Sequence, residues 1–195
     1  MSIEATLTLR QARERYFEEN GFGQGGNYDE RWVRVDVGPV PFWFPNSAER
    51  VRALRFHDLH HVLTGYRTDF PGECEISAWE VASGCTDHWV AWLLNLSGMG
   101  AGLFFMPRRI ARAFQRGLHT RNLYRSEYGE TLLGRTVEEM RSALGMDVPV
   151  PAPTWKDRMT FAGWSAAALL MSAVGTAAFL APVALAAWAL VNWLR

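Results

Sequence analysis

The chain has 195 residues, which is enough for one domain with its own hydrophobic core and a small additional segment. Its 20 Lys and Arg residues balance its 20 Asp and Glu residues, so the net charge of zero does not favour a nucleic-acid partner, and we expect none. Two cysteines, Cys74 and Cys85, are too few for a fold built on disulfides and fit a reducing compartment.

The first 20 residues predict that the catalytic part stays in the cytoplasm. They lack the apolar core of a signal peptide, and their four glutamates argue against an organellar transit peptide. Thr8 followed by Gln11 has the pattern of a capping box, which predicts a first helix over LRQARERYFEEN, residues 9–20. The glycine-rich segment 21–26 is expected to end that helix.

Two segments without helical periodicity follow. Residues 32–37, WVRVDV, alternate with period two and indicate a short strand or an extended arm. The proline-rich GPVPFWFPN at 38–46 cannot form a regular helix. We expect its aromatic residues Phe42, Trp43 and Phe44 to pack onto the body of the protein.

The centre of the chain predicts two helices joined by a turn. Asn46 with Glu49 offers a capped helix start, and Gly65 offers a natural end. Pro71 suits the first turn of the next helix, which we place over 73–82. The histidine-rich part of the first helix therefore lies near its C-terminal end.

A nearly charge-free segment, 90–106, is predicted to be a buried helix rather than a membrane span. It is short for a span, and Gly98, Gly100 and Gly102 would weaken it as an isolated helix.

Pro107 begins a basic helix that we extend to about Glu127. Arg108, Arg112 and Arg116 are four residues apart and form one stripe on it. The first interpretation is a solvated face. The alternatives are contact with anionic lipid headgroups and binding of a phosphate or carboxylate on an amphiphilic ligand.

These patterns predict an all-α protein with a compact helical metal-binding domain over 1–147. Its last helix is capped by Thr136 with Glu139. A proline-rich linker over 148–158 and a membrane-anchoring hydrophobic segment over 159–195 complete the predicted organisation.

The C-terminal segment predicts attachment to a membrane. Residues 159–194 contain no charged residue, and as one helix they would be about 54 Å long, more than one straight span through a bilayer core of about 30 Å needs. Because Gly175 and Pro182 lie near the middle, we favour two short membrane helices in a hairpin over one kinked span. Tryptophans near both ends resemble interfacial anchors. The alternative is a soluble pair of helices buried in an oligomer.

The segment HDLHHVLTGYRTDFPGE predicts a metal site. On a helix, His57, Asp58 and His61 fall within an arc of about 100°, and a turn at Gly65 would bring Glu73 to the same point. Two imidazoles and two carboxylates suit zinc, iron or manganese, with zinc as the default without a redox role. Two histidines four residues apart are, however, also a common chance feature of a helix.

Neighbouring residues were considered for the same site. Cys74 could be a thiolate ligand, but a buried inert thiol is the stronger interpretation. His60 lies outside the arc, so it either supports the ligands or lies in solvent. Glu75 and Glu80 are expected to lie in solvent or to support the ligands from outside.

The same segment resembles the signature of the coenzyme Q (ubiquinone) biosynthesis protein 4 family. That signature is His-Asp, two residues, His, eleven residues, Glu, and it matches His57-Asp58, His61 and Glu73 with the spacing intact. Weaker similarity covers residues 45–147. The chain before this stretch looks unlike the family, and the hydrophobic C-terminal segment is an addition.

The resemblance implies an all-helical fold that binds a polyprenyl quinone precursor or a similar isoprenoid lipid. It also implies a role in ubiquinone head-group synthesis, proposed as oxidative decarboxylation at C1 of the ring. By residue match, His57, Asp58, His61 and Glu73 would be the ligands of a divalent metal, zinc first and iron second.

Three functions therefore stand at this point. The first is a membrane-anchored metalloprotein that processes or presents polyprenylated ring precursors at the cell inner membrane, with its soluble domain on the cytoplasmic side. The second is a metal-dependent hydrolase of a lipid-like ester or phosphate. The third is a non-catalytic lipid-binding scaffold with a structural metal. Other quinone-biosynthesis enzymes and a second copy of the chain are the protein partners we consider.

Overall fold

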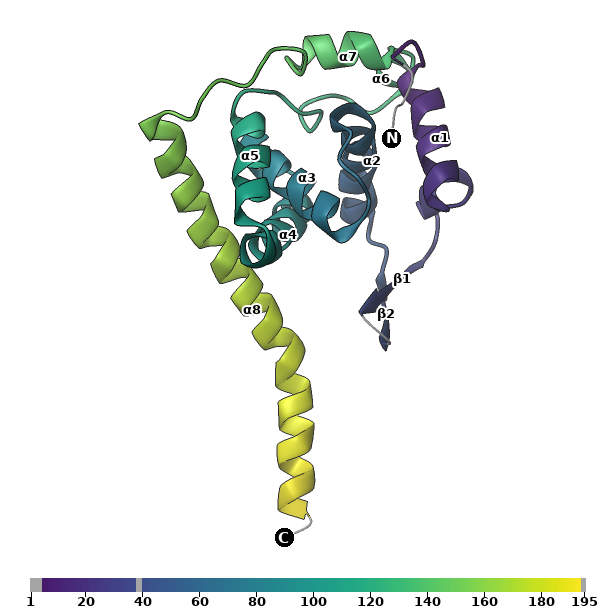
Figure 1. Cartoon of the computed structure of the whole chain (residues 1–195). Coiled ribbons are helices and arrows are strands. Elements are labelled where there is room, and N and C mark those ends of the chain that lie inside the picture. The colour runs from purple at the N-terminus through teal and green to yellow at the C-terminus, as the bar shows by residue number, and fades with distance from the viewer. Residues whose placement is uncertain (1–4, 38–39, 194–195) are drawn as a thin grey trace.

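The computed structural model of the chain describes residues 5–37 and 40–193, and most of them are helical. Figure 1 shows a body of short helices from which one long helix and a small hairpin project. The elements are α1 (Leu9–Asn20), a 3₁₀ turn (Gln24–Asn27), β1 (Trp32–Val37), β2 (Val40–Pro45), α2 (Ala48–Thr64), α3 (Phe70–Ser83), α4 (Trp89–Phe105), α5 (Pro107–Leu118), α6 (Glu130–Leu133), α7 (Val137–Ala143) and α8 (Trp155–Trp193).

The helix caps confirm several predicted boundaries. Both halves of the capping box at Thr8 and Gln11 are present, and so are both halves of the second one at Thr136 and Glu139. Gly65 ends α2 in the left-handed conformation, with φ of 75°, which glycine adopts without strain. Local sequence patterns therefore determined these ends.

The start of α2 is one residue later than predicted. Ser47 is the cap, because its side chain accepts the N–H of Arg50. Asn46 does not cap the helix; its Nδ2 donates to the carbonyl oxygens of Tyr28 at 3.1 Å and Glu30 at 2.9 Å. It ties the preceding loop to the start of α2.

The predicted basic helix ends at Leu118 instead of near Glu127. The chain leaves the helical path because the residues that follow are used in other contacts. Thr120 accepts the indole N–H of Trp79 at 2.8 Å, and the backbone N–H of Leu123 donates to Nε2 of His60 at 3.0 Å. Both contacts are to distant parts of the chain, so no local pattern indicated them.

The two strands form an antiparallel hairpin, which corrects the all-α prediction. The alternation over 32–37 predicted the first strand. Trp43 does not pack onto the body as expected, because 58% of its surface is exposed. Phe44 lies beneath the guanidinium of Arg50, 5.3 Å from its ring centre, and the side chain of Phe42 is outside the described residues.

The core has two parts, and Trp92 on α4 packs against both of them. One is formed by α1, α2, α6, α7 and the segment before α6, with Leu59, Leu63 and Leu123 fully buried. The other lies between α3, α4, α5 and the first half of α8, with Met99, Ile110 and Ala168 fully buried.

The glycines of α4 allow close packing on two sides. A Cβ at Gly98 would lie 2.4 Å from Oγ of Ser77, and one at Gly100 would lie 2.4 Å from the carbonyl oxygen of Ala168. The helix is therefore buried where it meets α3 and α8, as predicted. Its other side is not, because Phe104 and Phe105 are exposed.

The C-terminal segment is one continuous helix over its described residues, which corrects the favoured hairpin. Gly175 and Pro182 lie within it. A proline removes one helical hydrogen bond and bends a helix but does not have to end it. At about 1.5 Å per residue, α8 is about 58 Å long. Because α8 starts at Trp155, the linker without helix or strand is shorter than predicted, 148–154.

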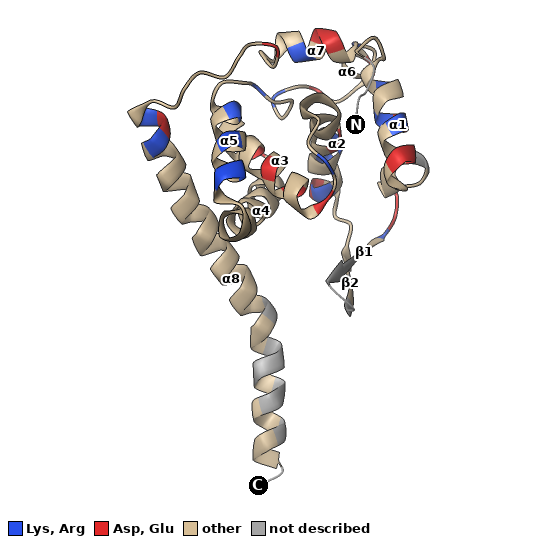
Figure 2. Cartoon of the chain, viewed as in Figure 1, with Lys and Arg blue, Asp and Glu red and all other residues tan. Residues whose placement is uncertain are grey.

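The two halves of α8 have different surroundings. The first half packs on the body, where Phe161 contacts Phe114 and Trp164 stacks on Trp92 at 5.0 Å. The second half projects away from the body (Figure 1). Figure 2 shows that the charged residues of α8 lie in its first turn. Within the described residues, Trp155–Ala178 is long and apolar enough to cross a membrane.

Candidate metal centre

The turn between α2 and α3 brings three predicted ligands together. The two Nε2 atoms of His57 and His61 are 3.1 Å apart. The carboxylate of Glu73 on α3 lies 3.4 Å from Nε2 of His57 and 3.3 Å from Nε2 of His61. These three side chains form a group that could hold a metal ion.

The Nδ1 atom of each of these two imidazoles faces an oxygen that can only accept a hydrogen bond. Nδ1 of His57 lies 2.9 Å from Oε1 of Glu80, and Nδ1 of His61 lies 2.9 Å from the carbonyl oxygen of Tyr66. In the neutral rings the proton is therefore on Nδ1, and both Nε2 atoms present lone pairs. Two lone pairs and a carboxylate that face one another repel unless a proton or a metal cation lies between them.

The spacing fits an ion of the size of zinc or iron. Ligand atoms about 2.0–2.2 Å from one ion lie about 3–3.5 Å from each other in tetrahedral or octahedral coordination. The distance between the two Nε2 atoms lies in this range, and so does the distance from each Nε2 to one oxygen of Glu73, Oε2 for His57 and Oε1 for His61. Imidazole nitrogen with carboxylate oxygen suits zinc, iron and manganese, so the residues fit the predicted divalent metal without selecting one.

Glu80 is the centre of a buried hydrogen-bond network behind the histidines. Its Oε1 accepts from Nδ1 of His57 and, at 2.6 Å, from Nδ1 of His60. Its Oε2 accepts from the Tyr124 hydroxyl at 2.7 Å and from Nδ2 of Asn95. Four donors occupy the four acceptor positions of a carboxylate that is fully buried, so Glu80 fixes the orientation of His57.

His60 belongs to this network and not to the metal group. Because its Nε2 accepts the backbone N–H of Leu123, its Nδ1 carries the proton that Glu80 accepts. Burial lowers the pKa of His60, which keeps the ring neutral.

Two carboxylates of the cluster are ionised. Burial would raise the pKa of Glu73, but hydrogen bonds from His57 and His61 outweigh it and lower this pKa to about 2 when Nε2 of these rings carries a proton. In that form a proton occupies the place that a metal ion takes beside the neutral rings. Burial opposes the ionisation of Glu80 too, yet His57 and His60 hold its pKa well below the usual range. The two carboxylates lie on opposite sides of the His57 ring, Glu80 fully buried and Glu73 partly exposed, and their negative charge favours a cation at the Nε2 side.

Three aromatic and basic residues hold the end of α2 that carries the histidines. The ring of Tyr16 stacks on His61 with centroids 5.6 Å apart. Arg141 donates to the carbonyl oxygen of Leu63 at 2.8 Å, and Arg116 donates to that of Thr64 at 2.9 Å. Cations at the C-terminal carbonyls complement the helix dipole and fix this end.

Asp58, the fourth predicted ligand, has a different partner. Its carboxylate accepts a hydrogen bond from the Tyr28 hydroxyl at 2.5 Å, and it is not part of the group of three. Burial raises the pKa of Asp58. Asp58 as a metal ligand stays a prediction of the sequence pattern.

The other considered residues lie outside the group. Glu75 receives two hydrogen bonds from the guanidinium of Arg109, at 3.0 and 2.6 Å. The Cys74 thiol is buried, and burial raises its pKa to about 11, as expected for an inert thiol.

A cavity of about 300 Å³ adjoins the group. His57 and Glu73 line one part of it, and small or apolar residues line another; the latter are Ala53, Leu54, Ala91, Leu94 and Gly98. Arg50 also lines it and supplies a positive charge. Because Leu94 is half exposed, the cavity opens to the surface beside α4.

The sequence pattern missed the supporting residues Asn95 and Tyr124, whereas support of the ligands was one of the two roles expected for Glu80. Glu80 lies seven residues after Glu73, two helical turns along the same side of α3, and this spacing was the available signal. No such signal exists for Asn95 or Tyr124, which reach Glu80 from distant segments.

Comparison with known proteins identifies no relative. No family model, no curated protein and no solved structure matches the chain. The resemblance to the coenzyme Q biosynthesis protein 4 family therefore stays a prediction from the histidine and glutamate spacing.

Proposed function

We propose that this chain is a membrane-attached metalloprotein of ubiquinone biosynthesis that acts on a polyprenylated ring precursor. The arrangement of His57, His61 and Glu73 beside an open cavity carries the proposal. The spacing of these residues, which resembles the family signature, supports the choice of pathway.

His57, His61 and Glu73 would hold one divalent ion, with zinc as the first choice and iron as the second. An ion bound there would supply Lewis acidity toward a carboxylate or phenolate oxygen of the ring. Zinc does not change its oxidation state, so an oxidative decarboxylation at C1 favours iron or requires a separate oxidant.

The residues around the cavity suit an amphiphilic substrate. The guanidinium of Arg50 can pair with an anionic ring substituent. Leu54, Ala91 and Leu94 give apolar contact to the ring or to the first part of an isoprenoid tail. Glu80 has no acceptor position left for a substrate, so its role is to position His57.

The cavity also bears on the two rival functions. Three protein ligands with an adjoining space are typical of a catalytic metal site, whereas a structural site has four protein ligands and no space. This favours an enzyme over a scaffold with a structural metal. A hydrolase of a lipid-like ester or phosphate would use the same three ligands, and the substrate decides between it and the first proposal.

The projecting half of α8 would enter the membrane. Residues 175–193 are about 28 Å long, close to a bilayer core of about 30 Å. Lys156 and Arg158 lie at the opposite end of the helix, next to the body. The tendency of Lys and Arg to remain in the cytoplasm then puts the body on the cytoplasmic side of the inner membrane.

Cells that lack the protein test the function. We expect them to accumulate a polyprenylated ring precursor, identified by mass spectrometry of lipid extracts, and we expect the full chain but not His57→Ala to remove it. A His119→Ala variant serves as a matched control, because His119 lies on the half-exposed end of α5. Normal ubiquinone content without the protein would contradict the proposal.

A further inference from the structure

The register of the β1–β2 hairpin places apolar residues on one of its faces. In its register Val33 pairs with Phe44, Val35 with Phe42, and Val37 with Val40. Alternate residues of a strand share a face, so these six apolar residues belong to one face of the hairpin. Among the described elements, each strand makes its extensive contact with the other strand of the hairpin.

The opposite face of the hairpin carries two exposed tryptophans. Trp32 and Trp43 both have more than half of their surface in solvent. The guanidinium of Arg34 lies 5.8 Å from the ring centre of Trp43. Tryptophan next to arginine is typical of residues at the level of lipid headgroups, because the indole is partly apolar and the guanidinium binds phosphate.

A second exposed aromatic group lies at the C-terminal end of α4. Phe104 and Phe105 are 72% and 74% exposed, and Phe105 contacts the exposed Phe70 with centroids 5.8 Å apart. Arg108, three residues after Phe105, is exposed as well. We call Trp32, Trp43, Phe70, Phe104 and Phe105 the aromatic rim.

The end of α4 lies where α8 leaves the body. The two helices run in the same direction, since Trp92 stacks on Trp164 and Ser172 donates to the carbonyl oxygen of Ser97. Phe104 and Phe105, about two turns after Ser97, are then level with the start of the projecting half of α8.

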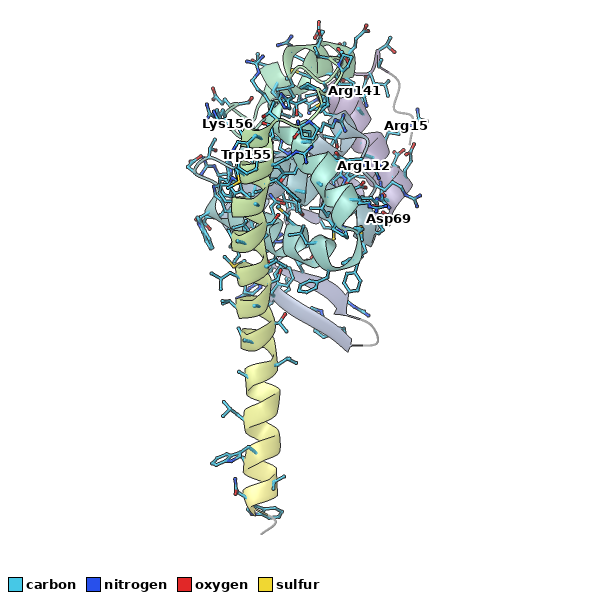
Figure 3. All side chains as sticks on the ribbon, turned by 60° about the vertical axis from the view of Figure 1, so that its left-hand side comes forward. Arg15, Asp69, Arg112, Arg141, Trp155 and Lys156 are labelled. Atoms are coloured by element: carbon cyan, nitrogen blue, oxygen red, sulfur yellow. The ribbon has the colours of Figure 1, made fainter. Side chains whose placement is uncertain are left out.

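The hairpin projects on the same side of the body as α8. Figures 1 and 3 show this from two directions, and in both the hairpin lies below the helices of the body, near the level at which α8 leaves it. The labelled Trp155 and Lys156 mark the other, body-side end of α8 in Figure 3. A plane across α8 where it leaves the body therefore passes the aromatic rim.

We propose that the aromatic rim and the hairpin rest in the headgroup region of the bilayer that α8 enters. This inference relies on the membrane attachment of α8 and adds a second, separate contact with the same membrane. A two-stranded hairpin has open edges with unpaired backbone groups, which the hydrocarbon core would not satisfy. The hairpin therefore stays at the interface instead of crossing the membrane.

The contact would place the entrance of the metal cavity at the lipid surface. Arg50 lines the cavity and lies over Phe44 of the hairpin. Leu94, which also lines the cavity, belongs to the same helix as Phe104 and Phe105. A substrate with an isoprenoid tail could then pass from the bilayer into the cavity without exposing its tail to water.

Quenching by labelled lipids tests this contact in the full chain. Single Trp43→Cys, Trp188→Cys and Glu138→Cys variants are labelled with a small environment-sensitive fluorophore, and the protein is reconstituted into phosphatidylcholine–phosphatidylglycerol vesicles. Part of the lipid carries a nitroxide near the headgroup. Cys74 and Cys85 are buried, so unsubstituted protein measures background labelling.

The three labelled positions report on different parts of the molecule. Trp188 reports membrane insertion of α8, and Glu138 on α7 lies at the opposite end of the body from the hairpin (Figure 1). We expect quenching at position 43 at least half as strong as at position 188, and none at position 138.

Quenching at 188 but not at 43 overturns the inference and leaves the membrane attachment of α8 intact. A blue-shifted but unquenched label at 43 also overturns it, because a protein surface, such as a second copy of the chain, then covers the hairpin. Absence of quenching at both positions overturns the membrane attachment as well.

Discussion

The metal centre and the projecting half of α8 depart from ordinary protein packing in opposite ways. Between α2 and α3, the carboxylate of Glu80 and the imidazoles of His60 and His61 are buried, and the carboxylate of Glu73 is partly exposed beside them. Along the second half of α8, large apolar residues face outward; the described ones include Leu185, Trp188 and Trp193. Burial of charge and exposure of apolar surface both cost free energy in water.

The two regions require different partners to offset these costs in free energy. The buried carboxylates have an almost complete set of hydrogen-bond partners within the chain, and a cation between Nε2 of His57 and Nε2 of His61 completes it. Among the described residues of α8, those that pack against α4 and α5 lie in its first half, so the exposed apolar residues of the second half have no comparable partners within the chain. The first region predicts a small ion, and the second predicts a membrane.

The largest expected effect comes from breaking the buried network. Glu80→Ala leaves four donors without an acceptor, and we expect a loss of about 3–5 kcal/mol in the free energy of unfolding. Glu75→Ala, on the same helix, removes a half-exposed ion pair with Arg109 and should cost about 1 kcal/mol or less. Denaturant unfolding in detergent measures both; equal losses would contradict the assigned role of Glu80.

The next effect tests the docked half of α8. Gly100→Ala places a methyl group 2.4 Å from the carbonyl oxygen of Ala168, and overpacking of this kind costs about 1–3 kcal/mol. The matched control is Gly163→Ala on α8, where a Cβ meets no atom within 4 Å and alanine favours the helix. Thermal unfolding should show a lower midpoint for the first variant alone. An unchanged midpoint for Gly100→Ala would mean that α8 is not docked as described.

The smallest expected effect is on metal affinity, and it tests whether Asp58 is a fourth ligand beside His57, His61 and Glu73. Because Asp58 accepts from Tyr28, we expect Asp58→Asn to lower metal affinity by less than about tenfold, or 1.4 kcal/mol. Glu73→Gln, in contrast, removes a ligand of the group. Calorimetric titration with zinc compares the two, and an equal loss would make Asp58 a ligand, as the family resemblance implies.

Local patterns in the sequence predicted what depends on neighbouring residues. The capping boxes at Thr8 and Thr136 and the turn at Gly65 need only a few adjacent residues, and all three are present. The approach of His57, His61 and Glu73 follows from one helix, one turn and the next helix, so the spacing was enough to predict it.

Contacts between distant segments were beyond the local patterns. The end of α5 depends on Leu123 donating to His60, which is 63 residues away in the sequence. The continuous α8 was not predicted for another reason. Pro182 was expected to interrupt the helix, but a proline removes one hydrogen bond and does not have to end a long helix. The exposure of Trp43 was not predicted, because the aromatic segment around it is equally compatible with a buried strand and with an exposed one.

Metal titration of the purified full chain tests the central claim most directly. The protein, extracted in mild detergent and treated with a chelator, is titrated with zinc and with ferrous iron in a calorimeter. We predict that the chain binds about one ion and that His57→Ala, which removes one of three ligands, binds at least about tenfold more weakly. Absence of binding of either ion by the unsubstituted chain, or equal binding by His57→Ala, would contradict the metal centre between α2 and α3.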